Sequence, residues 1–399
     1  MTPQKNIGIY LSSEPKDGGK FQYSMSILEA LAFPNKNFNV TAFYLDENWK
    51  KYIPNNINKF HIKISKFYLI IKIIRKIILF CPLGISIWRK VGKLIDSKQI
   101  CFFKKNIELI LFPGNDSLSY LTTKKTIAPI HDLMHIYEKR FKEVGSKKTY
   151  NSREKYYKNV CKYSKAIFVD SELGKKHVLE NYKVNYSKIY VVPYNAPSYV
   201  SANKENNDEL LKSYNLPDKF IFYPAQFWEH KNHRNLIKAI FLLKKQNLII
   251  NVVLVGSMIK EFEYVYKEAL SLISNYKLNS QIYILGYVNN EELVQLYKRA
   301  IALIMPTFFG PTNIPPLEAF ALGCPVLTSN IYAIPEQVGN AALLFDPNDY
   351  VDIAEKIKII YSNIELRNNL TKLGNKRSIL FSQEKSNNKV NKIIFDLLK

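Results

Sequence analysis

Cysteine is scarce in this sequence, and the four cysteines lie far apart. They are Cys81, Cys101, Cys161 and Cys324, and no two of them form a C-x-x-C motif. Structural zinc sites and the disulfide frameworks of small secreted domains both need closely spaced cysteines. The pattern therefore excludes both classes and indicates a chain that works in a reducing compartment.

Glycine and proline are also sparse, with 14 and 18 among 399 residues. Collagen-like chains and flexible linkers need far higher fractions of these two residues. Hydrophobic residues make up 47% and charged residues 23% of the sequence, which is typical of folded globular proteins. The length suffices for two domains of ordinary size with large buried cores.

Long uncharged hydrophobic runs are missing as well. The most apolar stretch covers residues 67–88, but Lys72, Arg75 and Lys76 interrupt it and leave an uncharged run of 12 residues, Ile77–Trp88. A membrane-spanning helix needs about 20 apolar residues. The N-terminal residues MTPQKNIGIY also lack the apolar core of a secretory signal peptide. We therefore expect no transmembrane helix and no export.

Acidic residues are few in the first half of the chain. Residues 1–200 carry 34 basic and 15 acidic side chains, a net charge of +19, whereas residues 201–399 carry 23 and 19, a net charge of +4. Within residues 63–93, basic side chains that include Lys72, Arg75 and Lys76 punctuate an apolar segment. This composition is typical of an interfacial helix that docks on anionic lipid through its cations. A core helix with a solvated basic edge is the alternative.

The net charge of +23 is also compatible with nucleic-acid binding. The basic excess, however, lies in an apolar helical segment and not among exposed aromatic residues of a sheet, on which bases stack. We therefore expect an anionic membrane surface, and no nucleic acid, as a partner.

Short apolar runs that end in polar loops alternate with helical patterns along both halves of the chain. This alternation predicts an α/β protein with two doubly wound domains of parallel strands. The polar run Tyr194–Asn215 is the best candidate for the linker between them. Such domains bind ligands at the carboxyl ends of their strands, and hence in the cleft between the two. The expected strands are residues 4–10, 39–45, 107–112, 125–130, 166–169 and 188–192, then 220–224, 249–255, 281–285, 301–305, 325–329 and 342–345.

The segment Pro306–Pro325 carries the strongest candidate site. A loop rich in glycine and proline follows a predicted strand and feeds a helix near Pro316, where proline suits the first helical position. Free backbone N–H groups at such a helix start bind anions. Glu318, expected in the first turn, could accept hydrogen bonds from sugar hydroxyls; alternatively, it only complements the positive end of the helix.

Two further candidates follow predicted strands. Lys231, within Phe227–His233, would reach into the cleft and neutralise a diphosphate, although a solvated loop lysine is the commoner outcome. His131 would contact a substrate. His131 and His135 have the i, i+4 spacing of zinc ligands, but the sequence lacks the glutamate of H-E-x-x-H and an evident third ligand. We therefore expect a capping or packing role for His135.

Gly18 and Gly19 follow the first strand and would allow a ligand to approach the backbone closely. The run Asp170-Ser171-Glu172 resembles a D-x-D metal site, but a strand end with Ser171 near a helix N-cap is the alternative that we favour. Because no other acidic cluster suits Mg²⁺, the sequence predicts neither a metal nor a cofactor.

In their order along the chain, these motifs resemble the family-4 (GT4) retaining glycosyltransferases of the GT-B fold, most strongly over residues 220–347. Glu318, within Pro315–Ala319, matches the final glutamate of the family pattern E-G-F-G-L-P-P-L-E, and Ala321–Val326 resembles its A-x-G-x-P-V. Further matches are Asp17-Gly18-Gly19 with the glycine loop, His131 with the cleft histidine and Lys231 with the diphosphate lysine.

The resemblance implies a retaining, metal-independent transfer from a nucleoside-diphosphate sugar to a cell-surface polysaccharide or a lipid-linked saccharide. It implies a cytoplasmic enzyme, peripheral on the inner face of the plasma membrane. The N-terminal acceptor domain would cover residues 1–200, with a C-terminal helix at about 380–399 packed back on it, and the nucleotide-sugar domain 216–379. His131 and Lys231 would be catalytic. The expected donor-binding residues are Gly18, Gly19, Gln226, Lys231, Gly256, Thr312, Asn313, Ile314, Pro315 and Glu318.

The sequence departs from the family pattern at two positions. The first glutamate of the family's E-x7-E pair would fall at Gly310, and the arginine that precedes the lysine is replaced by Gln226. Sugar recognition must therefore differ, for example through Pro311, Thr312 or Asn313. The alternatives are a related GT-B transferase of sugar phosphates or polyol phosphates, a catalytically impaired nucleotide-sugar-binding protein and, less favoured, a basic nucleic-acid-binding protein.

Overall fold

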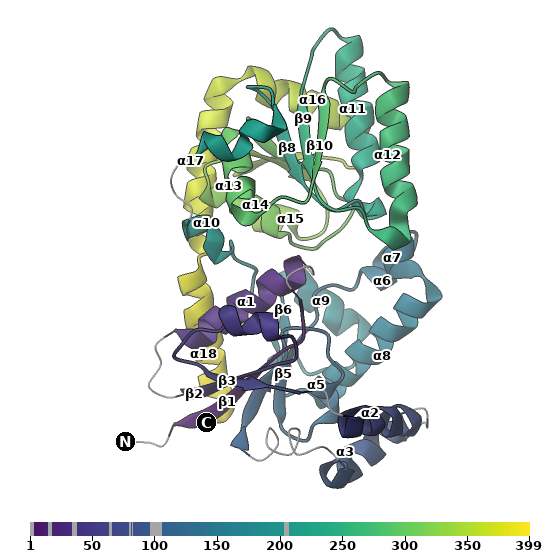
Figure 1. Ribbon diagram of the computed structural model, residues 1–399, viewed down its shortest axis with the longest axis vertical. Helices are drawn as coiled ribbons and strands as arrows, with labels where there is room; N and C mark the ends of the chain where they lie inside the picture. The colour runs from purple at the N-terminus through teal and green to yellow at the C-terminus, as the bar shows by residue number, and fades with distance from the viewer. Residues whose placement is uncertain are drawn as a thin grey trace.

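The computed structural model describes residues 4–14, 18–33, 38–63, 66–79, 81, 83–95, 106–202 and 207–399. These residues form two α/β domains, one above the other in Figure 1, each built around one sheet. All strand pairs in both sheets are parallel. The expected fold class, two doubly wound α/β domains, is confirmed.

The N-terminal sheet has seven strands in the order β3-β2-β1-β4-β5-β6-β7. Two of its inner strands, Leu109–Leu111 and Ala166–Val169, are short apolar runs that are buried along their whole length, because helices cover the sheet. The edge strand β3 is polar and more exposed, and the sequence did not predict it. The strands are β1 (Lys5–Leu11), β2 (Phe38–Tyr44), β3 (Asn58–His61), β4 (Leu109–Leu111), β5 (Lys125–Pro129), β6 (Ala166–Val169) and β7 (Ile189–Val191).

The C-terminal sheet has six strands in the order β10-β9-β8-β11-β12-β13. Every strand expected for this half is present, with ends that differ by at most three residues. The strands are β8 (Ile221–Pro224), β9 (Val252–Val255), β10 (Ile282–Gly286), β11 (Ala302–Met305), β12 (Val326–Ser329) and β13 (Ala342–Phe345).

Each sheet reverses its strand order at one point, between β1 and β4 in the first domain and between β8 and β11 in the second. Loops diverge at such a point and leave room for a ligand at the carboxyl ends of the strands. Gly18 and Gly19 follow β1, Lys231 follows β8, and the loop Pro306–Asn313 follows β11. The topology therefore places three of the predicted motifs at the two reversal points.

Helices connect the strands and cover the sheets. In the first domain they are α1 (Gly19–Ala32), η2 (Glu47–Lys51), α2 (Lys66–Ile78), α3 (Gly84–Ile95), α5 (Leu118–Leu121), α6 (Met134–Tyr137), α7 (Lys142–Gly145), α8 (Lys147–Tyr163), α9 (Glu172–Asn181) and η3 (Tyr186–Lys188). The predicted linker contains α10 (Ser198–Ala202) and η4 (Asp208–Tyr214). The remaining helices are η5 (Glu229–Lys231), α11 (His233–Lys245), η6 (Lys260–Phe262), α12 (Glu263–Asn275), α13 (Asn290–Arg299), α14 (Ile314–Ala321), α15 (Ile334–Val338), α16 (Tyr350–Ser362), α17 (Ile364–Leu380) and α18 (Gln383–Leu398).

The C-terminal helix α18 packs on the first domain, beside α1 (Figure 1). Val390 and Ile394 are part of the hydrophobic core of that domain. The amide of Asn391 donates to the backbone carbonyl of Ala30 at 2.8 Å, and Gln383 donates to that of Ser26 at 3.0 Å. The end of the chain therefore ties the second domain to the first.

Residues 63–93 form two helices, α2 and α3, where the sequence predicts one. The chain turns tightly before α3, because a Cβ at Gly84 would lie 1.9 Å from the carbonyl oxygen of Ile78. Ile71 is buried against Trp88 of α3, so the apolar residues of α2 do not all face outward. The exposed apolar side chains of α2 are Leu69, Ile70, Ile73, Ile74 and Ile77. Within the described part of the chain, no helix is both long and apolar enough to cross a membrane.

Candidate functional site

Lys231 ends the short helix η5 and lies half-buried between the two domains. Its Nζ donates to Oδ1 of Asn313 at 3.4 Å, and its carbonyl accepts a hydrogen bond from the hydroxyl of Tyr223 at 2.8 Å. Burial lowers the pKa of Lys231 to about 8, although the charge of Glu143 partly opposes this shift. Lys231 therefore carries a positive charge at neutral pH next to the loop that follows β11.

The loop Gly310–Asn313 is fixed by its own amides. Asn313 Nδ2 donates to the carbonyl of Gly310 at 3.0 Å, and the backbone N–H of Asn313 donates to Oε1 of Gln337 at 3.0 Å. Gly310 has a φ of +113°, and a Cβ there would lie 2.8 Å from the Asn313 amide. Position 310 therefore favours glycine, and a larger side chain there would have to displace the Asn313 amide.

Helix α14 begins at Ile314, so Glu318 lies in the second turn. The expectation that it lies in the first turn is wrong. Pro315 and Pro316 occupy the first turn and have no N–H groups. The helix start consequently offers an anion fewer donors than an ordinary N-terminus. Pro315, expected to bind the donor, has only its ring and its carbonyl for that task.

Glu318 is buried and has two tyrosine partners. The hydroxyl of Tyr199 in α10 donates to Oε1, and the hydroxyl of Tyr297 donates to Oε2. Burial raises the pKa of Glu318, and the two tyrosine hydrogen bonds offset part of this shift. The predicted linker therefore touches a predicted donor-binding residue, a contact for which the sequence carries no signal.

The first domain places the glycine loop opposite α14. A Cβ at Gly19 would lie 3.8 Å from Cδ1 of Ile314, so the glycine loop and the start of α14 face each other across the domain boundary. His131 Nδ1 lies 3.1 Å from the hydroxyl of Tyr194, and Tyr23 packs its ring edge against the imidazole. Burial lowers the pKa of His131 to about 4, which leaves it neutral at pH 7. Asp17 lies outside the described residues.

Two residues from the stretches that were weighed as metal sites have other partners in the structure. His135 donates its ring N–H to Glu154 at 3.0 Å and packs against tyrosines, in line with the packing role expected for it. Ser171 caps α9, where its Oγ accepts the N–H of Gly174 at 3.0 Å, as the sequence analysis favoured. Across the described ranges, no three His, Cys, Asp or Glu side chains are grouped so that they could hold a metal ion.

Asp170, which directly follows β6, contacts the second domain. It accepts a hydrogen bond from the hydroxyl of Thr312, which belongs to the loop after β11. Burial raises the pKa of Asp170 to about 6, and the Thr312 and Ser171 hydrogen bonds counteract part of this effect. This contact and the approach of Gly19 to Ile314 hold the two domains together where the ligand is expected.

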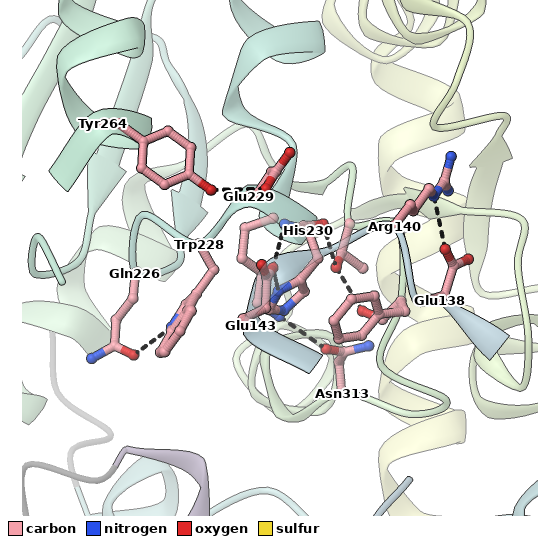
Figure 2. A network of polar contacts seen from close by, with 12 residues as sticks. Glu138, Arg140, Glu143, Gln226, Trp228, Glu229, His230, Tyr264 and Asn313 are labelled. Carbon is pink, nitrogen blue, oxygen red and sulfur yellow. Dashed lines mark hydrogen bonds and ion pairs between the residues drawn. The ribbon is translucent and has the colours of Figure 1, made fainter. Parts of the chain in front are cut away.

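The remaining expected donor-binding residues lie around Lys231. The side chain of Gln226 accepts a hydrogen bond from the indole N–H of Trp228 at 3.0 Å (Figure 2). Gly256 has a φ of +154°, and its N–H donates to the carbonyl of Gly286 at 2.8 Å. A Cβ at Gly256 would lie 2.2 Å from the carbonyl oxygen of Ala225, so glycine lets β9 approach the loop that leads to Lys231.

One hydrogen-bonded pair at the domain boundary was not predicted from the sequence. Glu143, in α7 of the first domain, accepts hydrogen bonds from the backbone N–H of His230 at 2.9 Å and from its Nδ1 at 2.7 Å. Figure 2 shows the two side chains facing each other. The His230 ring stacks on Phe309, with centroids 3.9 Å apart. These residues are 87 positions apart, and nothing in either local sequence indicates the pairing.

Comparison with known proteins finds a family match in the second half of the chain. Residues 206–377 match the family model "Glycosyl transferases group 1". The serotype-specific mannosyltransferase WbdA of Escherichia coli is 27% identical over 235 residues, which are 57% of this chain and 28% of that protein. This chain therefore spans less than a third of that relative. The O-antigen chain mannosyltransferase B of Escherichia coli is 23% identical over 339 residues, which are 84% of this chain and 85% of that protein.

Among solved structures, a glycosyltransferase from Rickettsia africae ESF-5 matches with a TM-score of 0.74 over 99% of both chains, at 20% identity. At this identity the likeness shows the fold alone. Together with the two parallel sheets, it shows that this chain has the GT-B fold.

Proposed function

We propose that this chain, whose residues 206–377 belong to glycosyl transferases group 1, moves a sugar from a nucleoside-diphosphate sugar to a polysaccharide or lipid-linked saccharide acceptor. One observation carries the proposal. Lys231 and the start of α14 lie at the strand reversal of the second domain, and the start of α14 faces Gly19, which follows β1 at the strand reversal of the first. A cation between two such domains suits a diphosphate leaving group.

The second domain would hold the donor. When the bond between the sugar and the diphosphate breaks, negative charge develops on the leaving phosphate and needs a preorganised cation. Lys231 supplies that cation, and Glu318 would accept the ribose hydroxyls once Tyr199 gives way. His131 is neutral at pH 7, so it would hydrogen-bond a sugar hydroxyl without adding charge.

The acceptor would enter from the first domain and attack on the face that the leaving group departs from, which retains the configuration. The departing phosphate would take the proton of the acceptor hydroxyl. A double displacement normally needs two carboxylates about 5 Å apart. Gly310 replaces one of them, so we infer direct same-face attack. We also propose that no metal ion takes part, and activity should therefore survive EDTA.

Mannose is the first donor sugar to test, because both relatives described above are named mannosyltransferases. A thermal-shift screen of UDP-, GDP- and dTDP-sugars identifies the donor. A ligand at 100 times its Kd adds about 2.7 kcal/mol of apparent stability. Gly310 and Gln226 favour one alternative, a catalytically impaired nucleotide-sugar-binding protein. Donor hydrolysis separates it from an enzyme, since an impaired protein would bind the donor without releasing nucleotide.

We further propose that α2 docks this enzyme on an anionic membrane, at the inner face of the plasma membrane in the cytoplasm. An exposed apolar face on α2 lies beside Lys72, Arg75 and Lys76. Each cation near an anionic surface contributes about 1 kcal/mol. Burial raises the pKa of Asp116, and the charges of Arg75 and Lys72 offset part of this rise. These two cations therefore also lie close to the body of the domain.

Vesicle flotation tests the docking proposal. The protein should float with anionic vesicles, only weakly with neutral ones, and less at high salt, because surface charges are screened within about 8 Å at physiological ionic strength. The triple variant Lys72→Glu, Arg75→Glu, Lys76→Glu should abolish flotation. A second triple variant, Ile70→Ser, Ile73→Ser, Ile77→Ser, should also abolish it, and this one leaves the cations near Asp116 unchanged.

A control variant with the same change of charge, Lys147→Glu, Lys148→Glu, Lys155→Glu on α8, should float like the wild type. Equal flotation with neutral and anionic vesicles, or none with either, would contradict the docking proposal. A DNA gel shift at the same salt concentration separates membrane binding from nucleic-acid binding.

A further inference from the structure

Only one of the two carboxylate oxygens of Glu143 accepts hydrogen bonds from the described residues. Its side chain is 4% exposed, and its Oε1 accepts both hydrogen bonds from His230. Its Oε2 is buried and has no hydrogen-bond partner among the residues that the structure describes. A buried acceptor without a donor costs stability, and more so when it is charged, so such an atom calls for a ligand that supplies the donor.

The surroundings of Glu143 keep it ionised. Burial alone would raise its pKa, but the hydrogen bonds from His230 outweigh burial and lower it. Burial lowers the pKa of His230 to about 4, so the neutral ring acts as the donor at pH 7. An ionised carboxylate oxygen is a strong acceptor for hydroxyl groups, and it repels phosphates. The chemistry of Oε2 therefore selects a sugar hydroxyl.

Glu143 lies next to residues that are expected to bind the donor. His230 directly precedes Lys231, and the ring of His230 stacks on Phe309, the residue before Gly310. The charge of Glu143 acts on Lys231, whose pKa it raises against the effect of burial. A sugar whose diphosphate binds Lys231 would therefore lie near this carboxylate.

We propose that Glu143 binds a hydroxyl of the donor sugar through Oε2, and that the first domain thereby supplies the carboxylate that Gly310 leaves out of the second. The inference rests on the proposed function, because it needs a nucleoside-diphosphate sugar in the cleft. It also makes sugar recognition depend on closure of the two domains, since α7 and η5 belong to different domains.

Calorimetry with GDP-mannose and GDP tests the assignment in Glu143→Gln. The glutamine oxygen still accepts from His230, so the domain contact survives while the charge is lost. Hydrogen bonds to charged groups correspond to about 10- to 100-fold in affinity. The Kd for GDP-mannose should rise by about this factor, and the Kd for GDP should stay within about twofold. Glu138→Gln is the matched control, because Glu138 also contacts the other domain but has partners for both oxygens, Tyr332 and Arg140.

Monodeoxy analogues of GDP-mannose give a second readout that does not depend on the stability of the variant. In the wild type, removal of the hydroxyl that Glu143 binds should weaken affinity, and in Glu143→Gln the same removal should change little. An unchanged preference for GDP-mannose over GDP in Glu143→Gln, or equal deoxy effects in both proteins, would overturn the assignment. A wild type that binds none of the screened nucleotide sugars would instead overturn the proposed function, and this inference with it.

Discussion

The hydroxyl of Tyr199 donates a hydrogen bond to the carboxylate of Glu318, so a residue of the linker occupies the group expected to hold the ribose. The second oxygen of Glu318 accepts from Tyr297, which belongs to the same domain. Donor binding through Glu318 must therefore displace Tyr199 and leave Tyr297 in place. Tyr199 of the short helix α10 therefore competes with the nucleotide for the carboxylate of Glu318.

This competition predicts opposite effects of two substitutions. Tyr199→Phe should strengthen binding of GDP on the order of 10-fold, because a charged hydrogen bond no longer has to be broken. Glu318→Ala should weaken it by about 10- to 100-fold. Calorimetry of both variants checks the pair. Unchanged GDP affinity in both would mean that the ribose does not reach Glu318.

Lys231 should dominate catalysis. Lys231→Ala should lower turnover of the donor by roughly 100-fold or more, as is typical when one group that stabilises developing charge is lost. Lys245→Ala, an exposed lysine on α11, serves as the control and should behave like the wild type. The rate of nucleotide release from the donor provides the measurement. A folded Lys231→Ala protein with nearly normal turnover would remove Lys231 from the mechanism.

The pH dependence of diphosphate binding follows from the same residue. Lys231 has a pKa of about 8 in the free protein, so it is charged below that pH and loses its charge as the pH rises through it. GDP affinity should therefore fall between about pH 7 and pH 9. Arginine stays charged throughout this range, so Lys231→Arg should make binding much less sensitive to pH. The same fall in Lys231→Arg as in the wild type would assign the titration to another group.

Gly310 should be intolerant of any side chain. Gly310→Ala forces a residue with a Cβ to a φ of +113° and brings that Cβ 2.8 Å from the amide of Asn313, which Gly310 itself holds in place. Gly286→Ala is the control, because Gly286 also has a positive φ but open space around its Cβ position. The left-handed region costs an ordinary residue about 1–2 kcal/mol. Thermal unfolding should show the larger loss of Tm for Gly310→Ala, and equal losses would contradict the steric argument.

The sequence predicted the sheets well because buried parallel strands are continuous apolar runs that end in polar loops. Val252–Val255 and Ala302–Met305 are such runs, and both are fully buried. The edge strand Asn58–His61 was not predicted because it is polar. The break between α2 and α3 was not predicted because it depends on the approach of Gly84 to Ile78. Local patterns carry little information on either feature.

The candidate site was predictable only in part. Lys231 and His131 follow predicted strands, and Glu318 lies near a predicted helix start, so their positions in the sequence pattern made them candidates. The contacts between domains, such as Glu143 with His230 and Tyr199 with Glu318, join residues 87 and 119 positions apart. These contacts depend on how the folded parts of the chain pack against each other, and no local sequence pattern indicates that packing.

Release of nucleotide from a panel of UDP-, GDP- and dTDP-sugars, with no acceptor added, tests the central claim most directly. A glycosyltransferase hydrolyses its own donor slowly when water takes the place of the acceptor. The account predicts slow release from one donor, GDP-mannose being the first candidate, and a rate at least 100-fold lower in Lys231→Ala. Binding of a nucleotide sugar without release of nucleotide, in a protein that is folded by thermal unfolding, would contradict the claim and identify a nucleotide-sugar-binding protein.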